Sequence, residues 1–271
     1  WIDAQPHADP ARCGVAIDTD FPDIEQARRI VSAASNRERL LEQSYDALAD
    51  KLAALQSANP PALLSDLPLV EVPNAGGGEL FAVLISGDGG WAGIDKEVAS
   101  ALQAQNVAVV GLDSLRYFWT ERTPAGVARD LDRIVQYYGT HWQKSRVLLI
   151  GYSQGANVLP FALNRLATAT RERVAASVMM GLGERADFEF HLSNWVRSSD
   201  DGLPIAPELQ RLVGGNPVCI YGEQETDSLC PTLDPARIRL IRLPGGHHFD
   251  GDYERLARLI IDAARKPLAA R

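Results

Sequence analysis

The chain has 271 residues, with 27 lysines and arginines against 35 aspartates and glutamates, which gives a formal net charge of −8. Hydrophobic residues make up 46% and charged residues 23%, so disorder, collagen and coiled coil are excluded as descriptions of the whole chain. The acidic balance argues against a nucleic-acid-binding protein, and no apolar run reaches the roughly 18 residues that a membrane span needs.

The first 70 residues are expected to form a helical segment or the remnant of a preceding domain. Residues 1–20 are polar and rich in turns, and apolar side chains then recur at spacings of three and four from Pro22 to about Ser57. Two prolines at 60 and 61 end that pattern, and the composition changes near residue 70. We therefore expect the main domain to span residues 71–271.

Beyond residue 71, short apolar strands alternate with amphipathic helices, which indicates an α/β fold with a mostly parallel sheet flanked by helices. About six strands favour an open, doubly wound sheet over a closed barrel. Residues 181–216 break the alternation, and we expect an insertion at about 184–215 over the carboxyl ends of the strands. The expected strands are 80–86, 107–112, 146–151, 174–180, 217–221 and 238–243, and the expected helices are 94–105, 124–138, 154–166 and 253–264.

One serine lies in a pattern that is typical of catalytic nucleophiles. Residues 151–155 read Gly-Tyr-Ser-Gln-Gly, and a predicted strand runs into this G-x-S-x-G sequence while a predicted helix runs out of it. A nucleophile elbow needs this strand–turn–helix arrangement, because only glycines leave room for so tight a turn. Ser153 is therefore the predicted nucleophile. The alternative is a serine that caps the helix and has no chemical role.

A serine needs a base, and two adjacent histidines are placed to supply one. His247 and His248 follow the last predicted strand, so their loop opens at the same edge of the sheet as Ser153. We favour His247 as the base, because Phe249 is then left to pack beneath the loop. The alternative is a solvated polar loop without a catalytic role.

The third member of a triad would be a carboxylate in the loop after the strand at 217–221. The chain order nucleophile, acid, histidine is the order found in hydrolases with this kind of elbow. Glu225 has the more usual register after the glycine that ends the strand, and Asp227 is the second candidate. Acids are common in surface loops, so the order along the chain carries most of this inference.

Acyl transfer also needs donors for the developing oxyanion. The loop at 86–91, Ser-Gly-Asp-Gly-Gly-Trp, follows the first strand of the predicted domain and leaves backbone N–H groups free. We assign the oxyanion hole to the N–H of Asp88 or Gly89 together with that of Gln154. Neither glycine-rich phosphate-binding pattern is present, and the alternative is a simple turn.

Five aromatic residues fall in predicted loops near the strand ends. Together they would line an apolar pocket for an acyl chain or a lipid, whereas each taken singly is better explained by packing. The residues are Trp91, Tyr117, Phe118, Trp119 and Trp195.

The chain has three cysteines, Cys13, Cys219 and Cys230, and none has the spacing of a zinc ligand. Cys219 and Cys230 flank a turn-rich loop. Their spacing alone leaves open whether they form a disulfide or remain separate.

Five segments in a constant order resemble the VirJ/AcvB family of bacterial virulence proteins over about residues 78–265. This resemblance implies an α/β-hydrolase fold and export to the periplasm, an oxidising compartment in which a Cys219–Cys230 disulfide is favoured. The chain starts at Trp1, so we expect that a targeting segment has been removed. Residues 1–70 carry no motif of the family. The five segments are LISGDGGW, GYSQGA, FEFH with a later Trp, YGEQETDSLCP and LPGGHHFDGDY.

The resemblance also implies an activity. AcvB-type members are understood to hydrolyse aminoacyl-phosphatidylglycerol, which releases lysine or alanine from the lipid head group. Carried over to this sequence, it implies Ser153 as nucleophile, His247 or His248 as base, and Glu225 or Asp227 as orienting acid. The expected partner is an aminoacylated phospholipid at the membrane surface, with no cofactor, metal ion or nucleic acid.

Two alternatives remain open at this point. Shorter VirJ members are associated with type IV secretion, so the chain would then be a periplasmic binding protein that assists secretion-system proteins and keeps a vestigial triad. The second alternative is a generic carboxylesterase, which only the family resemblance separates from the lipid hydrolase.

Overall fold

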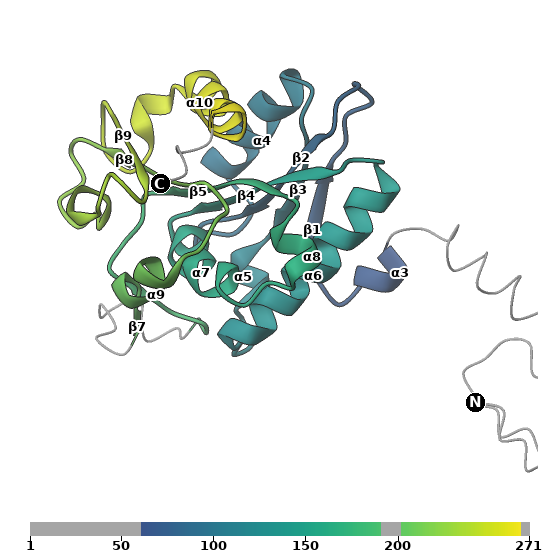
Figure 1. The fold of residues 1–271 in the computed structure, drawn as a ribbon, viewed down its shortest axis with the longest axis horizontal. Coiled ribbons are helices and arrows are strands. Elements are labelled where there is room, and N and C mark those ends of the chain that lie inside the picture. Colours follow the sequence, from purple (N-terminus) through teal and green to yellow (C-terminus); the bar gives the residue numbers. More distant parts are fainter. Residues whose placement is uncertain (1–60, 191–201, 267–271) are drawn as a thin grey trace, which may run out of the picture. The chain divides into compact units, whose positions relative to one another are not determined.

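The fold is built around one sheet whose strands are nearly all parallel (Figure 1). A computed structural model describes residues 61–190 and 202–266. The strand order is β1-β3-β2-β4-β5-β8-β9, with β1 antiparallel to β3 and every other pair parallel. The strands are β1 (Leu69–Val72), β2 (Leu80–Ile85), β3 (Ala108–Leu112), β4 (Arg146–Tyr152), β5 (Val174–Met180), β8 (Pro217–Gly222) and β9 (Arg239–Leu243).

The inner strands are continuous apolar runs because both faces of the sheet are covered. In β2, Phe81, Val83 and Ile85 belong to one core, whereas Ala82 and Leu84 belong to the other. This division follows from the two-residue period of a strand, which sends successive side chains to opposite faces. A chain that buries both faces therefore needs no polar alternation along the strand.

Two pairs of longer helices form the outer layers (Figure 1). On one face, α6 (Pro124–His141) packs beside α7 (Gln154–Leu163), and on the other α4 (Ile94–Ala104) packs beside α10 (Tyr253–Arg265). No helix in the described ranges has both the length and the apolar character needed to cross a bilayer. The shorter helices are α3 (Pro61–Leu64), α5 (Ser114–Tyr117), α8 (Thr168–Arg171), α9 (Ala206–Arg211), and the 3-10 turns η2 (Cys230–Thr232) and η3 (Phe249–Gly251).

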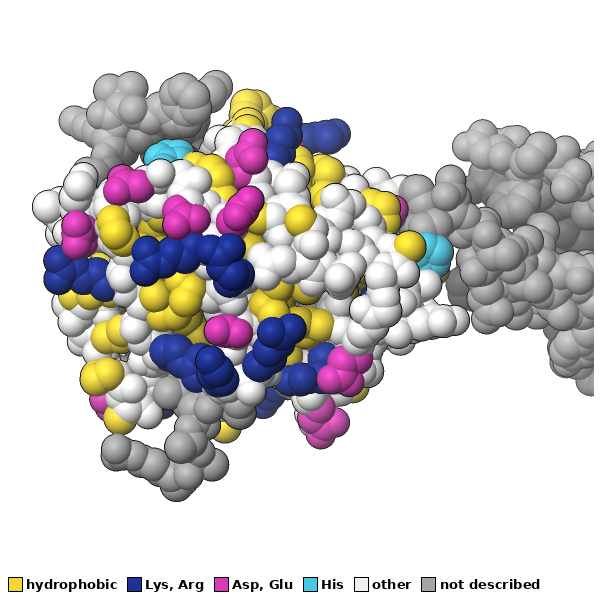
Figure 2. Space-filling view, turned by 90° about the horizontal axis from the view of Figure 1, so that it is seen from above, with side chains coloured by type: hydrophobic (Ala, Val, Ile, Leu, Met, Phe, Trp, Pro, Cys, Tyr) yellow, Lys and Arg dark blue, Asp and Glu magenta, His cyan; other side chains and the backbone are white. Residues whose placement is uncertain are grey.

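The surface over α4 and α10 carries charges of both signs. Figure 2 shows bands of lysine and arginine on this face, with acidic side chains beside them. Within and just after α10, Arg258 pairs with Glu254 at 3.8 Å and Lys266 with Asp262 at 3.6 Å, each four residues apart. Such pairs are typical of a solvated helix surface.

The α/β architecture and all six expected strands are confirmed. The antiparallel edge strand β1 was not expected. Within the expected insertion, β6 (Arg185–Ala186) pairs with β7 (Leu203–Pro204) and α9 follows. Residues 191–201 and the helix expected from Pro22 to about Ser57 lie outside the described residues. The domain boundary near residue 70 therefore stays a prediction.

The parallel strands bring the chemistry to one edge. The loops after β2, β4, β5, β8 and β9 all leave from the carboxyl ends of the sheet. These loops hold the residues that the sequence marks as nucleophile, base, acid and oxyanion donors.

Candidate active site

Ser153 lies in a strained turn between β4 and α7. Its φ and ψ are 51° and −113°, a conformation that L-residues rarely adopt. A Cβ on Gly151 would collide with the backbone of Gly155, and a Cβ on Gly155 would collide with the carbonyl of Ile85. The two glycines of the motif are therefore required by packing. The arrangement has the strand–turn–helix form of a nucleophile elbow.

Hydrogen bonds to both neighbouring strands hold this turn in place. The N–H of Ser153 donates to the carbonyl of Met180 at 2.9 Å, and that of Gly155 donates to the carbonyl of Ser86 at 3.1 Å. The turn is thus fixed between β5 and the segment that follows β2. Strain at a functional residue persists only where the surroundings impose it in this way.

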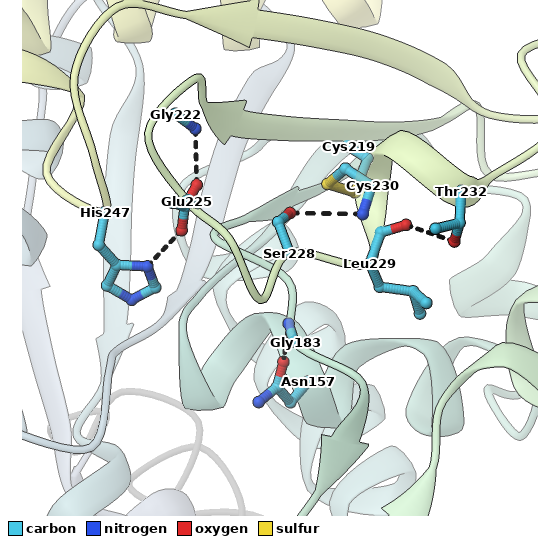
Figure 3. Close-up of a disulfide and its surroundings, with 10 residues drawn as sticks. All are labelled: Asn157, Gly183, Cys219, Gly222, Glu225, Ser228, Leu229, Cys230, Thr232 and His247. Carbon is cyan, nitrogen blue, oxygen red and sulfur yellow. Dashed lines mark hydrogen bonds and ion pairs between the residues drawn. A yellow bond between two sulfur atoms is a disulfide. The ribbon is translucent and has the colours of Figure 1, made fainter.

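His247 and Glu225, from the loops after β9 and β8, form a close pair (Figure 3). Nδ1 of His247 lies 2.5 Å from Oε1 of Glu225, and Oε2 of Glu225 accepts the N–H of Gly222 at 2.6 Å. The Glu225 side chain is only 5% exposed, whereas that of His247 is 42% exposed. A carboxylate accepts hydrogen bonds only, so this contact places a proton on Nδ1 and leaves Nε2 of a neutral ring as an acceptor.

The electrostatics of the pair favour the protonated imidazole. The hydrogen bond to Glu225 raises the pKa of His247 and outweighs the opposing effect of burial, while the charges of Glu225, Asp227 and Asp88 act in the same direction as the bond. Of the two candidate acids it is Glu225 that contacts the imidazole. Of the two candidate bases it is His247 that is paired, whereas His248 is exposed.

A glycine that the sequence reasoning missed makes room for the histidine. Gly181 follows β5 directly with a φ of +63°, and a Cβ at this position would lie 2.5 Å from an atom of the His247 ring. The hydroxyl of Tyr152 also donates to the carbonyl of His247 at 3.3 Å. The only sequence signal for Gly181 is its position at the end of a predicted strand.

Ser153, His247 and Glu225 share the wall of one cavity of about 390 Å³. It opens between the loops that follow β4, β5, β8 and β9. Among its described lining residues, Glu225 and Asp227 are acidic and none is a lysine or arginine. The lining is Ser153, Asn157, Gly181, Gly183, Gln224, Glu225, Thr226, Asp227, Gly246 and His247.

The expected oxyanion donors come from two segments, the start of α7 and the loop after β2. The N–H of Gln154 is the first of α7, so the helix itself offers it no acceptor. The loop after β2 passes close to the nucleophile, because a Cβ on Gly87 would lie 3.6 Å from the Cβ of Ser153. Asp88 and Gly89 follow in this loop and are exposed, but they are not part of the cavity lining.

The four described residues of the expected aromatic pocket do not gather at this cavity. Tyr117 and Phe118 are fully buried in the core, where the Tyr117 hydroxyl donates to Asp130 at 2.6 Å. Trp91 packs over Gly111 of β3, and Trp119 is 60% exposed. None of these four lines the cavity. Trp195 lies outside the described residues.

The short helix α5 explains why Tyr117 and Phe118 lie in the core and not at the edge of the sheet. Asp113 accepts the N–H of Arg116 and so starts a helix directly after β3. This turn of helix carries Tyr117 and the next residue, Phe118, back into the core, where the Phe118 ring meets those of Phe188 and Phe190 edge-on at 6.2 Å. A loop would have left the rings at the edge of the sheet.

The Cys219–Cys230 disulfide is present, with the two Cα atoms 5.8 Å apart. It joins β8 to η2 and closes the loop that carries Glu225 (Figure 3). The N–H of Leu229 within this loop also donates to the carbonyl of Leu182 at 2.9 Å. The acid loop (222–230) is therefore held at its start by β8 and at its end by the disulfide and this hydrogen bond. A disulfide is consistent with a location outside the cytoplasm.

The fold is shared with solved structures that include esterases. Est1E from Butyrivibrio proteoclasticus matches with a TM-score of 0.52 and 15% identity, over 73% of this chain and 93% of that one. The Pyrococcus furiosus esterase Pf2001 matches with a TM-score of 0.50 and 15% identity, over 78% and 96%. TT1662 from Thermus thermophilus matches with a TM-score of 0.51 and 13% identity, over 76% of this chain and 95% of that one. At these identities the likeness establishes the α/β-hydrolase fold alone.

No curated protein matches the chain. The family model described as "Bacterial virulence protein (VirJ)" matches residues 79–268, which is well over half of the chain and includes every strand of the main sheet except β1. The protein therefore belongs to the VirJ family and has an α/β-hydrolase fold.

Proposed function

We propose that the protein is a serine hydrolase that cleaves the aminoacyl ester of lysyl- or alanyl-phosphatidylglycerol. The products are the free amino acid and phosphatidylglycerol. The observation that carries the hydrolase assignment is the Glu225–His247 pair in the same cavity as Ser153, which lies in a strained elbow. The resemblance to AcvB-type proteins supports the lipid substrate, and the disulfide supports action in the periplasm.

The proposed reaction has two halves. Oγ of Ser153 attacks the aminoacyl carbonyl while Nε2 of His247 takes its proton, and the ester bond to the lipid glycerol then breaks as the imidazolium returns that proton to the glycerol oxygen. Water next attacks the acyl-enzyme while the same imidazole takes its proton. The bond to Oγ of Ser153 then breaks as the imidazolium returns that proton to Oγ, and the amino acid leaves. Glu225 holds the ring and stabilises its charged form in both halves.

The N–H of Gln154 and one from the loop after β2 would bind the negative charge on the tetrahedral intermediate. Such donors commonly contribute a factor of about 10² to 10³ each. The donor in the β2 loop is Asp88 or Gly89.

The cavity charge favours an acyl group that bears an ammonium. Glu225 and Asp227 line the wall, and the lining contains no lysine or arginine. An α-ammonium next to the scissile carbonyl is attracted by these carboxylates, whereas an anionic acyl group is repelled. The aminoacyl ester meets this requirement.

The test mixes the protein with vesicles that contain lysyl- or alanyl-phosphatidylglycerol and follows amino-acid release by mass spectrometry. We expect release by the wild type and a loss of at least about 10³-fold in Ser153→Ala. Ser100→Ala, an exposed serine on α4, is the matched control and keeps full activity. Equal release by Ser153→Ala would contradict the proposal.

Two other results would favour the alternatives. Release of fatty acid in place of amino acid would indicate a generic carboxylesterase. Failure of a fluorophosphonate to label Ser153 in folded protein would favour a secretion-accessory protein with a vestigial triad.

A further inference from the structure

Two buried serines outside the proposed triad lie between the segments that supply the expected oxyanion donors. Ser86 follows β2 directly, and Ser114 is the first residue of α5. Both are fully buried, with an exposed fraction of 0%. A buried hydroxyl is costly unless it is hydrogen-bonded, so the partners of these two side chains show what they hold in place.

Reciprocal hydrogen bonds join the two serines. The N–H of Ser114 donates to Oγ of Ser86 at 2.9 Å, and Oγ of Ser114 donates to the carbonyl of Ser86 at 2.7 Å. The N–H of Ser86 donates to the carbonyl of Leu112 at 3.0 Å, which continues the pairing of β2 with β3 by one residue. The start of α5 is thereby fixed against the start of the loop after β2.

From Oγ of Ser86 the hydrogen bonds lead to the turn that carries one donor. This Oγ donates to the carbonyl of Gly87 at 3.2 Å, and the same carbonyl accepts the N–H of Gly90 at 3.1 Å. The second bond closes a four-residue turn, 87–90, whose central residues are Asp88 and Gly89. Within the described part of the chain no acceptor takes the N–H of either central residue, so both are available to an oxyanion.

The turn at 87–90 also packs closely against the start of α5. A Cβ on Gly90 would lie 2.8 Å from Oδ1 of Asp113 and 3.1 Å from the Cβ of Leu115. Gly90 has a φ of +75°, a conformation that favours glycine. A displacement of α5 would therefore displace the turn as well.

From the carbonyl of Ser86 the hydrogen bonds lead to the other donor. Besides the Oγ–H of Ser114, this carbonyl accepts the N–H of Gly155 at 3.1 Å. Gly155 follows Gln154, whose N–H is the second expected donor, in the first turn of α7. A Cβ on Gly155 would lie 2.9 Å from the carbonyl oxygen of Ser86, so the elbow lies directly against this residue.

We propose that Ser86 and Ser114 are positioning residues that set the distance between the two N–H donors of the oxyanion hole, one in the turn at 87–90 and one at Gln154. This inference rests on the proposed hydrolase function. An oxyanion needs both donors at about 2.7–3.1 Å at the same time, although they come from segments far apart in the sequence. Neither serine lines the cavity, so each acts through the backbone groups that it holds.

The test measures p-nitrophenyl acetate hydrolysis by Ser86→Ala and Ser114→Ala, with kcat calculated per active site titrated by a fluorophosphonate. Each variant removes one hydroxyl of the pair. We expect kcat to fall by about tenfold with KM within about twofold, because displaced donors stabilise the developing charge less well while the site for the neutral ester is intact.

Phenylboronic acid separates an effect on the oxyanion hole from a general loss of structure. Oγ of Ser153 adds to its boron and the proton passes to His247, which gives a tetrahedral boronate with an oxygen in the place of the oxyanion. Its Ki should therefore rise by the factor by which kcat falls.

The matched control is Ser177→Ala. Ser177 is a buried serine of β5 that does not line the cavity, and its Oγ donates to the carbonyl of Gly215 at 3.1 Å. The variant loses a comparable hydrogen bond and should keep the kcat and the Ki of the wild type. Unchanged kcat in both Ser86→Ala and Ser114→Ala would overturn the proposal. A fall in kcat without a rise in Ki would overturn it too, since the donors would then still be in place.

A second measurement depends neither on hydrolysis nor on the variants. Amide hydrogen exchange of the wild type, followed by NMR, should be slow for the N–H groups that the serine pair and the turn hold, and fast for the proposed donors of the turn. The first group is Gly90, Ser114 and Gly155, and the second is Asp88 and Gly89.

Rapid exchange at Ser114 or Gly155 would overturn the proposal even if the alanine variants did not fold, because the pair would then not hold the two segments. Slow exchange in a wild type that hydrolyses no ester would instead refute the hydrolase function alone. The two failures are therefore distinguished.

Discussion

The acid loop (222–230) and the aromatic segment (114–119) occupy equivalent places and do opposite things. Each follows a parallel strand that lies one position in from an edge of the sheet, β8 in one case and β3 in the other. The acid loop faces the cavity, whereas Tyr117 and Phe118 of the aromatic segment turn into the core. A place at the carboxyl end of a strand therefore does not by itself make a residue part of the site.

What differs is the structure that follows each strand. The acid loop bonds to the histidine loop, since the N–H groups of Glu223 and Gln224 donate to the carbonyls of Leu243 and Gly245 at 2.8 and 2.9 Å. A side chain at Gly222 would prevent this close approach. The aromatic segment instead begins a helix at once. After β8, the hydrogen bonds between the acid loop and the histidine loop keep Glu225 at the cavity. After β3, the helix that begins at once turns the aromatic side chains into the core.

The largest effect is expected from Glu225→Gln. The amide can donate to Nδ1 of His247 and hold the ring in the wrong tautomer, so kcat should fall by roughly 10⁴-fold. The measurement is amino-acid release from aminoacyl-phosphatidylglycerol vesicles. Asp227→Asn removes the same charge without touching the imidazole and should stay within about tenfold of the wild type. Equal losses in the two variants would mean that the loop supplies charge and not orientation.

The aromatic segment should show the reverse pattern. Phe118→Ala removes a fully buried ring and should lower the free energy of unfolding by about 3–5 kcal/mol, measured by urea denaturation. Trp119→Ala, its exposed neighbour, should change stability by no more than about 0.5 kcal/mol. A Phe118→Ala protein of normal stability that no longer hydrolyses lipid would restore the aromatic-pocket interpretation.

The smallest effect is a shift in pH dependence. Because Glu225 raises the pKa of His247 above 6.5, the wild type should reach half of its maximal kcat/KM at a pH above 6.5, and Glu225→Gln at a lower pH. The base works only when neutral, so activity rises through this pKa. Stability has the opposite sign: the pairing of Glu225 with the imidazolium stabilises the fold fully below pH 6.5 and this contribution is lost as the pH rises through the folded-state pKa.

The stability half of this prediction is checked by urea denaturation at pH 5.5 and pH 9. The difference in unfolding free energy between wild type and Glu225→Gln should be larger at pH 5.5. A difference that is larger at pH 9 would contradict the assignment of the raised pKa to this pair.

Much of the fold was predictable because the inner strands are buried on both faces and read as apolar runs. The edge strand β1 was missed, since Leu69–Val72 is short, only partly buried and bounded by prolines at 68 and 73. Its pairing with β3 depends on a neighbour about forty residues along the chain, at the antiparallel edge. A strand this short has no local periodicity that would predict it.

The residues that the structure brings together in the candidate site were predictable to the extent that chain order fixes their places. Ser153, His247 and Glu225 follow from the elbow, the histidine loop and the register of the acid. Gly181 could not be found this way, because its need for a missing side chain depends on where the His247 ring comes to lie.

The disulfide lowers the loss of chain entropy that accompanies ordering of the acid loop on folding. Cys219 and Cys230 close a covalent ring that contains Glu225, so this stretch has fewer conformations open to it in the unfolded chain than it would have without the disulfide. Placing Glu225 opposite His247 on folding therefore costs less chain entropy. The covalent ring thus favours the hydrogen bond between Glu225 and His247, because it restricts the acid in the unfolded chain.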